Sequence, residues 1–291
     1  MRGLLYAVGA YAIWGCFPLF FNMLGGVPAM TVLAYRILFA CIFALLLIVI
    51  SRNLRPLRQL IRQKKILLWS LLASVLISLN WFVFIWAVGQ HRVLETSLGY
   101  FITPLVSLLL GRIMLKESIN LNQATAGVIA TIAILFELFA LGGVPWISIV
   151  LAGSFGLYGL VRKIQPMESL LGLTLETLWV VPVALVFVLN EAFIANIHYS
   201  LSDYSLLIFS GVLTAIPLLL FAVSVRQLNL VVAGFIMYLN PMMQFMTAVW
   251  ILGEAVPVQR YVTFVLVWIA MVFFIWGLVQ KHRATLAFVV K

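Results

Sequence analysis

Ten apolar runs, each long enough to cross a lipid bilayer, take up most of this chain. About 20 apolar residues cross a hydrocarbon core about 30 Å thick as a helix, because lipid offers no hydrogen-bond partner to a free backbone amide. The runs are Gly3 to Met23, Thr31 to Ile50, Ile66 to Val88, Glu95 to Leu115, Leu121 to Leu141, Pro145 to Val161, Leu170 to Leu189, Tyr204 to Val225, Val231 to Leu252 and Tyr261 to Val279. The sequence therefore predicts an all-α integral membrane protein with ten transmembrane helices.

Composition and motif content exclude most other classes. Hydrophobic residues make up 65% of the chain and charged residues 9%, against about 25% charged residues in a soluble domain. The first run follows Arg2 like a secretory signal, but it continues through Phe21, beyond the apolar core of such a signal, so we expect a retained span. Metalloprotease and phosphate-loop motifs are absent from the sequence. We expect no catalytic residue, no metal and no cofactor.

The chain contains an internal repeat. Pro104 precedes Glu117 by 13 residues, and Pro241 precedes Glu254 by the same interval, 137 positions later. The alignment extends without a gap over the surrounding residues, which predicts that a whole helical hairpin is duplicated. Repeats of this size in so apolar a chain are typical of transporters.

The repeat predicts two halves with opposite orientations in the membrane. We expect a first five-helix repeat over residues 1–143, a second over residues 144–282, and a cytoplasmic tail over residues 283–291. Because five is an odd number of crossings, the second copy enters the membrane from the side opposite the first. In transporters built this way, the substrate site lies near the midplane between the halves.

The net charge of +10 is distributed as the positive-inside rule requires. With both termini in the cytoplasm of a bacterial cell, fifteen of the eighteen basic residues lie on the inner side. These are Arg2, Arg52, Arg55, Arg58, Arg62, Lys64, Lys65, Arg112, Lys116, Arg162, Lys163, Arg226, Lys281, Arg283 and Lys291. The charge therefore predicts a multi-pass inner-membrane protein whose cations meet anionic lipid headgroups, not nucleic acid.

Arg36 is the most unusual single residue, because it lies inside an apolar run. A cation at the middle of a span costs at least ~2.5 kcal/mol on insertion scales. Aligning the two halves brings Glu176 opposite Arg36, at a depth that allows a direct or water-bridged ion pair. We expect Arg36 to bind an anionic or zwitterionic substrate, with Glu176 as its resting partner or as a proton-coupling carboxylate. The alternatives are a structural ion pair and a side chain that extends to water.

Pro104 and Pro241 are expected to kink the fourth and ninth helices, since proline removes a helical hydrogen bond. We expect hinges there that line a central cavity; the alternative is kinks that only shape packing. Glu117 and Glu254, at helix ends, are expected to anchor loops or to cap the following helix.

Aromatic and polar residues supply the remaining candidate walls of the cavity. Rings can stack on a planar or amphipathic substrate, although rings are also common in membrane proteins for packing alone. The expected substrate-binding residues besides Arg36 are Trp14, Asn80, Trp81, Tyr100, Tyr158 and Tyr238.

With these features in place, the chain resembles the drug/metabolite transporter superfamily, EamA type. The resemblance rests on the stretch from Pro104 to Leu115-Lys116-Glu117, its copy from Pro241 to Leu252-Gly253-Glu254, and ten helices in inverted halves. Trp14-Gly15, Phe17-Pro18, Ala34-Tyr35-Arg36 and Leu79-Asn80-Trp81 resemble the RarD permeases, a subgroup whose name is associated with chloramphenicol sensitivity. The resemblance implies a basket-shaped permease that moves small metabolites outward across the bacterial inner membrane.

These observations together predict a secondary transporter of small metabolites or drugs that works by alternating access, with or without proton coupling. A channel or permeability determinant without a coupled cycle is one alternative, and a membrane enzyme is another. The expected partners are a small-molecule substrate and membrane lipids. Ten helices can enclose a pathway in a monomer, and a homodimer is equally compatible.

Overall fold

The computed structural model describes residues 2–90, 93–141, 146–251 and 258–289, and these residues form helices joined by short loops, with no strand among them. The elements are α1 (Arg2–Gly15), α2 (Phe17–Asn22), α3 (Ala29–Ile50), α4 (Leu54–Ile61), α5 (Lys64–Gly89), α6 (Val93–Ile113), α7 (Leu121–Leu141), α8 (Trp146–Ile164), α9 (Ser169–Leu189), η1 (Asn190–Ile194), α10 (Leu201–Gln227), α11 (Leu230–Ile236), α12 (Leu239–Met246), η2 (Thr247–Ile251) and α13 (Val258–Val289). Both η elements are π-helices.

Eight of the helical segments described are long and apolar enough to cross a membrane, and they match eight of the ten expected runs. Two shorter apolar helices, Leu98–Ile113 and Leu230–Met246, coincide with the fourth and ninth runs. The inverted arrangement of the halves stays a prediction, and the expected boundary at residues 143 and 144 lies outside the described residues. Helix α13 continues through the expected tail as far as Val289.

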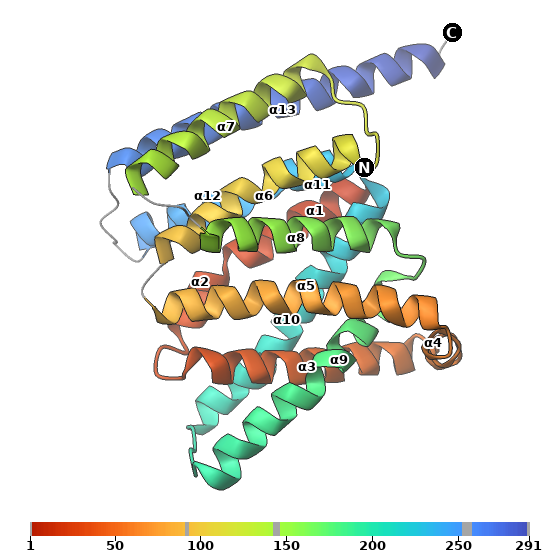
Figure 1. The fold of residues 1–291 in the computed structure, drawn as a ribbon, viewed down its shortest axis with the longest axis vertical. Coiled ribbons are helices and arrows are strands. Elements are labelled where there is room, and N and C mark those ends of the chain that lie inside the picture. Colours follow the sequence, from red (N-terminus) through yellow and green to blue (C-terminus); the bar gives the residue numbers. More distant parts are fainter. Residues whose placement is uncertain (1, 91–92, 142–145, 252–257, 290–291) are drawn as a thin grey trace.

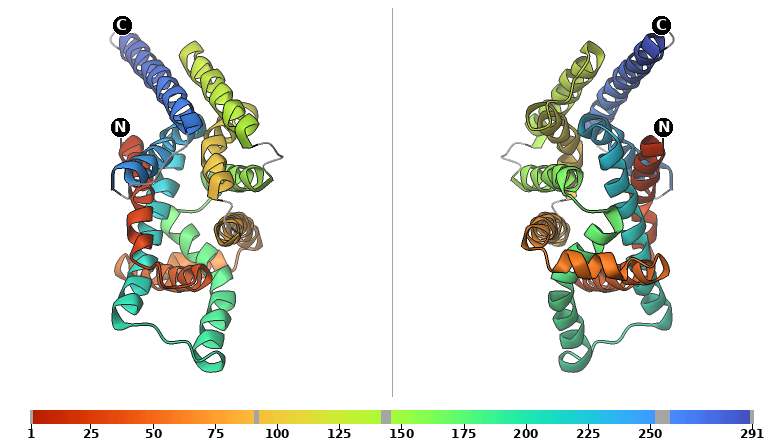
Figure 2. Two further views of the ribbon diagram at one scale, coloured as in Figure 1. Left: turned by 90° about the vertical axis from the view of Figure 1, so that its left-hand side faces the viewer. Right: turned by 90° about the vertical axis from the view of Figure 1, so that its right-hand side faces the viewer.

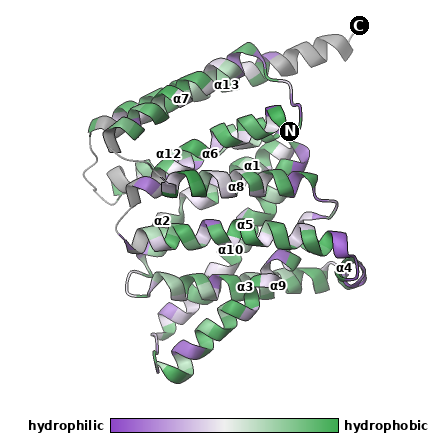
Figure 3. Cartoon of the chain, viewed as in Figure 1, coloured by the Kyte–Doolittle hydropathy of each residue, from purple (hydrophilic) through white to green (hydrophobic). Residues whose placement is uncertain are grey.

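The outside of the bundle is apolar, as a lipid-facing surface requires. Leu68, Leu121, Val183 and Val272 are among many exposed large hydrophobic side chains. Figure 3 shows that hydrophobic residues dominate the long helices and that hydrophilic residues gather at helix ends and on α4. The chain is therefore a multi-pass membrane protein.

Most of the long helices run side by side, so that their ends lie at two opposite faces of the molecule (Figure 1). Helix α4, the beginning of α1, the α6–α7 loop and the later part of α13 lie toward the same face, which we call the α4 end. Helices α7 and α13 pack on each other at one edge of the bundle, and α9 and α10 lie at the opposite edge (Figure 2).

The local sequence explains where helix α10 begins. The Ser200 hydroxyl oxygen accepts a hydrogen bond from the Asp203 N–H at 3.1 Å, and the same hydroxyl donates to the Asp203 carboxylate at 2.6 Å. Capping by a side chain satisfies one of the N–H groups that have no partner inside the first helical turn. Residues Ser200 and Asp203 thus fix the start of α10.

Residues made equivalent by the repeat meet at the centre of the bundle, where α6 packs against α11. The hydroxyl of Tyr238 donates to the carbonyl of Phe101 at 3.2 Å, and these residues are 137 positions apart, the interval of the repeat. Their ring centroids lie 6.4 Å apart. Gly234 allows this close approach, because a Cβ added there would lie 2.4 Å from the Cβ of Ser107.

The two repeat prolines lie in different local structures. Pro104 is inside the continuous helix α6, whereas the matching helix is divided into α11 and α12, with Met237 and Tyr238 between them. Pro241 is the third residue of α12, where its missing N–H has no intrahelical partner to lose. The second copy therefore carries a break where the first has an unbroken helix.

Candidate functional site

The side chain of Arg36 extends from α3 into a group of aromatic rings. Its guanidinium carbon lies 5.5 Å from the ring centroid of Phe17, 5.2 Å from that of Phe21 and 5.5 Å from that of Trp81. Its Nε donates a hydrogen bond to the hydroxyl of Thr214 at 2.8 Å. Cation–π contacts stabilise the positive charge without neutralising it.

No carboxylate of the described residues forms an ion pair with Arg36. The phenol of Tyr100, on α6, is close enough to interact with it electrostatically. A guanidinium binds carboxylates and phosphates through two parallel N–H donors. Arg36 therefore has the chemistry to bind an anionic group of a ligand, and its role in binding stays a prediction.

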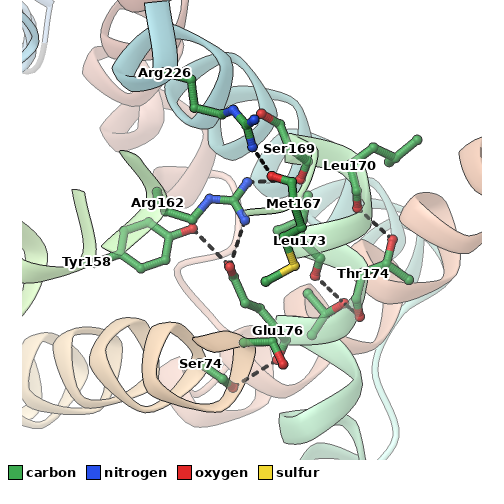
Figure 4. A network of polar contacts seen from close by, with 12 residues as sticks. Ser74, Tyr158, Arg162, Met167, Ser169, Leu170, Leu173, Thr174, Glu176 and Arg226 are labelled. Carbon is green, nitrogen blue, oxygen red and sulfur yellow. Dashed lines mark hydrogen bonds and ion pairs between the residues drawn. The ribbon is translucent and has the colours of Figure 1, made fainter. Parts of the chain in front are cut away.

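A second charged cluster joins α8 to α9 (Figure 4). Nη1 of Arg162 lies 2.7 Å from Oε1 of Glu176, and the two side chains are 1% and 2% exposed. Tyr158, one turn before Arg162 on α8, donates to Oε2 of Glu176 at 3.0 Å. Nη2 of Arg162 donates to the carbonyl of Ser169 at 2.9 Å. Glu176 thus has a full counter-charge and two hydrogen-bond donors inside the bundle.

This arrangement corrects the expected pairing of Glu176 with Arg36. Arg162 and Glu176 are only 14 residues apart, one on each side of the short α8–α9 turn. Both charges therefore belong to the same half of the chain, whereas Arg36 belongs to the other. Gly172 makes room for this geometry, since a Cβ there would lie 2.2 Å from Nη1 of Arg162.

Sequence analysis missed the role of Arg162. The sixth run was expected to end at Val161, with Arg162 in a cytoplasmic loop, but α8 continues to Ile164 and buries Arg162. The available signal was the spacing of Tyr158 and Arg162, because residues four apart lie on the same face of a helix.

A small cavity lies beside the Glu176 cluster. Its volume is about 20 Å³, which is room for about one water molecule, and it is lined by Ile37, Ile77, Ser78, Trp81, Tyr158, Leu173, Glu176, Thr177, Val180 and Leu218. The Ser78 hydroxyl is buried and has no hydrogen-bond partner in the described structure. Trp81 connects the cavity to Arg36, because its side chain lines the cavity and its ring also faces the guanidinium. An apolar lining with a few polar groups is typical of small-molecule sites, but such sites occupy roughly 300–1,000 Å³, so this cavity would have to widen to hold a ligand.

Three of the expected binding residues lie elsewhere in the core. Trp14 packs in an aromatic cluster with Tyr11, Phe155 and Phe221. The amide of Asn80 donates to the carbonyl of Leu151 at 2.9 Å and to the hydroxyl of Ser154 at 3.0 Å, which joins α5 to α8. Tyr238 is fully buried against Phe101. The cavity brings together Trp81, Tyr158 and Glu176, but its lining does not include Arg36, Tyr100, Trp14, Asn80 or Tyr238.

Glu117 caps a helix, but the helix belongs to the other half of the chain. Its Oε1 accepts from the N–H of Leu230 at 2.7 Å, and its Oε2 accepts from the N–H of Val231 at 3.0 Å. Nζ of Lys163 lies 3.6 Å from Oε1. Of the two expected roles, the anchoring of a loop is the one found: Glu117 binds the first turn of α11, not that of the following helix α7, and connects the α6–α7 loop to it. The corresponding residue, Glu254, lies outside the described residues.

Replacing Glu117 with Ala is expected to loosen the start of α11. The substitution leaves the N–H groups of Leu230 and Val231 without acceptors and Lys163 without a counter-charge, which costs about 1–3 kcal/mol. Hydrogen exchange at Leu230 and Val231 should become faster, as measured by mass spectrometry, whereas Glu117→Gln should give a smaller effect because it keeps one oxygen acceptor. Unchanged exchange in the Ala variant would contradict the capping role.

In the described part of the chain, no group of three or more His, Cys, Asp or Glu side chains is arranged to hold a metal ion. The candidate site is therefore built from the Arg36 guanidinium, the Glu176 cluster and the cavity beside Trp81.

Comparison with known proteins gives the family. The profile of the EamA-like transporter family matches residues 1–139. Protein RarD of Salmonella typhi is 39% identical over 285 residues, which cover 97% of each chain. The chain belongs to the EamA-like transporter family. The EamA match ends close to the predicted end of the first repeat, and the RarD relative extends the similarity through the second half.

Two further comparisons concern the family and the fold of this EamA-like chain. The uncharacterized transporter YojE of Bacillus subtilis is 37% identical and covers 98% of this chain and 97% of its own length. A crystal structure superposes with a TM-score of 0.71 over 94% of this chain and 96% of that chain, at 13% identity. At that identity the superposition shows the fold alone. Both the EamA-type and the RarD resemblance seen in the sequence are confirmed.

Proposed function

We propose that this EamA-like protein is a secondary transporter that carries small anionic or zwitterionic metabolites or drugs across the bacterial inner membrane by alternating access. The observation that carries the proposal is the guanidinium of Arg36. It is held among three rings, no carboxylate of the described residues is paired with it, and Trp81 connects it to the cavity. Because a cation inside a span is costly, an anionic group supplied by the substrate is the missing counter-charge.

The geometry of the cavity suggests how a zwitterion would bind. The carboxylate of a substrate would bind the guanidinium of Arg36, and the apolar part of the substrate would lie against Trp81. A positively charged group would face Glu176 on the opposite wall. The cavity is smaller than most ligand sites, so binding requires side chains to move apart.

Two features support alternating access. The bonds from Glu117 to the first turn of α11 close the α4 end, and opening that end requires them to break. Pro104 and the break before Pro241 are the proposed hinges, because helices bend where the hydrogen-bond ladder is interrupted. In this proposal both chain termini and the α4 end face the cytoplasm, and a monomer suffices to enclose the pathway.

The test is counterflow in proteoliposomes with labelled amino acids, short organic anions and chloramphenicol. A carrier gives saturable accumulation that unlabelled substrate competes away. Flux without saturation identifies a channel, and a covalently changed product identifies an enzyme. Equal signals in protein-containing and empty liposomes for every compound would contradict the proposal for these substrate classes.

Coupling to protons is proposed to run through Glu176, whose carboxylate lines the cavity while Arg162 and Tyr158 hold it. Replacing Glu176 with Gln keeps an oxygen acceptor but removes the titratable proton and leaves Arg162 without its counter-charge, so the amount of folded variant in the membrane is measured first. Accumulation driven by an imposed pH gradient should be lost in Glu176→Gln, while counterflow at equal pH persists. Gradient-driven accumulation at the wild-type level in this variant would assign coupling to another residue or to none.

A further inference from the structure

Helix α4 differs from the long helices in its direction. In Figure 1 it is seen end-on, whereas α3 and α5, which precede and follow it, run across the view. Figure 2 shows it lying crosswise at the ends of these two helices. Both α3 and α5 have the length and hydropathy of membrane spans. A helix perpendicular to them at their ends lies in the plane of the membrane surface.

One face of α4 is apolar and only partly covered by protein. Leu57 is buried in a cluster with Ile66 and Met167. Leu54 and Ile61, three residues before it and four after it, share its face and are 41% and 44% exposed. The protein therefore covers the centre of this apolar face and leaves both of its ends for another apolar environment.

The surface of α4 beside this apolar face is strongly basic. Arg55, Arg58 and Arg62 are spaced three and four residues apart, so they form one exposed stripe. Arg52, Lys64 and Lys65 are also exposed and flank the stripe in the adjoining turns.

These six cations have no protein counter-charge in the described structure. The first acidic residue of the chain is Glu95, so no carboxylate lies near them in the sequence. Glu168, in the α8–α9 turn, is exposed and makes no ion pair with them. Their charge is therefore available to an external anion.

We propose that α4 is a membrane-surface helix whose Arg55, Arg58 and Arg62 stripe binds the phosphate groups of anionic phospholipids, while Leu54 and Ile61 enter the acyl-chain boundary. A helix with a basic face and an apolar face lies in the interface of an anionic membrane. Clusters of four to eight basic residues beside a span are attracted to anionic lipid. Nucleic acid would satisfy the arginines but not the exposed Leu54 and Ile61, so the two faces together favour lipid.

The lipid would also act on the candidate site, because α4 and the α8–α9 turn contribute side chains to one buried cluster. Leu57 and Met167 belong to one buried cluster, and the carbonyl of Met167 accepts a hydrogen bond from Arg226. Two residues further, Ser169 accepts from Arg162. Lipid that holds α4 in place therefore stabilises the turn that positions the Arg162–Glu176 pair.

The experiment compares the full-length protein in vesicles of phosphatidylcholine alone with vesicles that also contain phosphatidylglycerol. The readouts are the thermal unfolding midpoint and the amount of phosphatidylglycerol retained in native mass spectrometry. The helix variant is Arg55→Gln/Arg58→Gln/Arg62→Gln. The wild type should unfold at a higher temperature with phosphatidylglycerol, and the helix variant should lose most of this rise and retain several-fold less of the lipid.

A matched control removes the same charge from the adjoining turns: Arg52→Asn/Lys64→Gln/Lys65→Gln. Asn is chosen at position 52 because the backbone there has a φ of 58°, which Asn tolerates. This control should keep most of the lipid effect. Equal losses in the two triple variants would overturn the proposal, because they would show that total charge alone attracts the lipid.

A second variant tests the apolar face without changing any charge. Leu54→Ser/Ile61→Ser should reduce the phosphatidylglycerol-dependent rise in the unfolding midpoint, and high salt should reduce it for the wild type. Retention of the full rise in Leu54→Ser/Ile61→Ser would contradict insertion of α4. Retention of the full rise by the wild type at high salt would contradict binding through the arginine stripe. An oligonucleotide that binds the detergent-solubilised wild type more tightly than phosphatidylglycerol does, and that the helix variant fails to bind, would overturn the assignment to lipid.

Discussion

Arg36→Gln is expected to abolish counterflow of the anionic substrate and to leave folded protein in the membrane. The charge of Arg36 contacts three rings and one hydroxyl, and no carboxylate of the described structure pairs with it. Removing it therefore orphans no buried charge and relieves the cost of holding a cation inside a span. Transport and stability should separate: counterflow falls to the level of empty liposomes, while the unfolding midpoint stays equal or rises.

Arg36→Lys is the matched control for this prediction. Lysine keeps the positive charge but has no planar pair of donors, so it binds a carboxylate less specifically. Counterflow should be partial, with a higher substrate concentration needed for half-saturation. Full counterflow in Arg36→Gln would remove Arg36 from the recognition site, and loss of folded protein would give it a structural role instead.

The membrane spans could be predicted from the sequence because the bilayer imposes one simple rule. Each span must be apolar and must satisfy its own backbone, so length and composition locate it. The unusual position of Arg36 could also be recognised from the sequence, since a charge within an apolar run is costly; its role in binding substrate stays a prediction. Tyr158 and Glu176 were predicted for separate roles, and the structure brings them within hydrogen-bond distance.

The partners of these residues could not be predicted, because depth in the membrane does not fix the rotation of a helix about its axis. Arg36 and Glu176 have compatible depths in the repeat alignment, yet Arg162 takes the carboxylate from the adjacent helix. Glu117 likewise binds a helix start 113 residues away. Such contacts depend on how the helices pack. Helix α4 was missed for another reason: a short helix between spans is too short and too polar to appear as an apolar run.

Arg162→Met is expected to cause the largest loss of stability among single substitutions at the site. It leaves the carboxylate of Glu176 buried, with the Tyr158 hydroxyl as its remaining side-chain donor. Breaking a buried ion pair by removing one partner costs about 3–5 kcal/mol, because the other charge stays in a low-dielectric interior. Reversible unfolding in mixed micelles measures this cost as a lower free energy of unfolding.

The double variant Arg162→Met/Glu176→Met decides whether the cost arises from the pair. Replacing both charges with apolar side chains of similar size removes the unpaired charge, so the double variant should be more stable than either single variant. Strict additivity of the two single effects would mean that the 2.7 Å contact contributes no coupling energy. The double variant should regain stability but not gradient-driven accumulation, because the carboxylate that carries the proposed proton is absent from it.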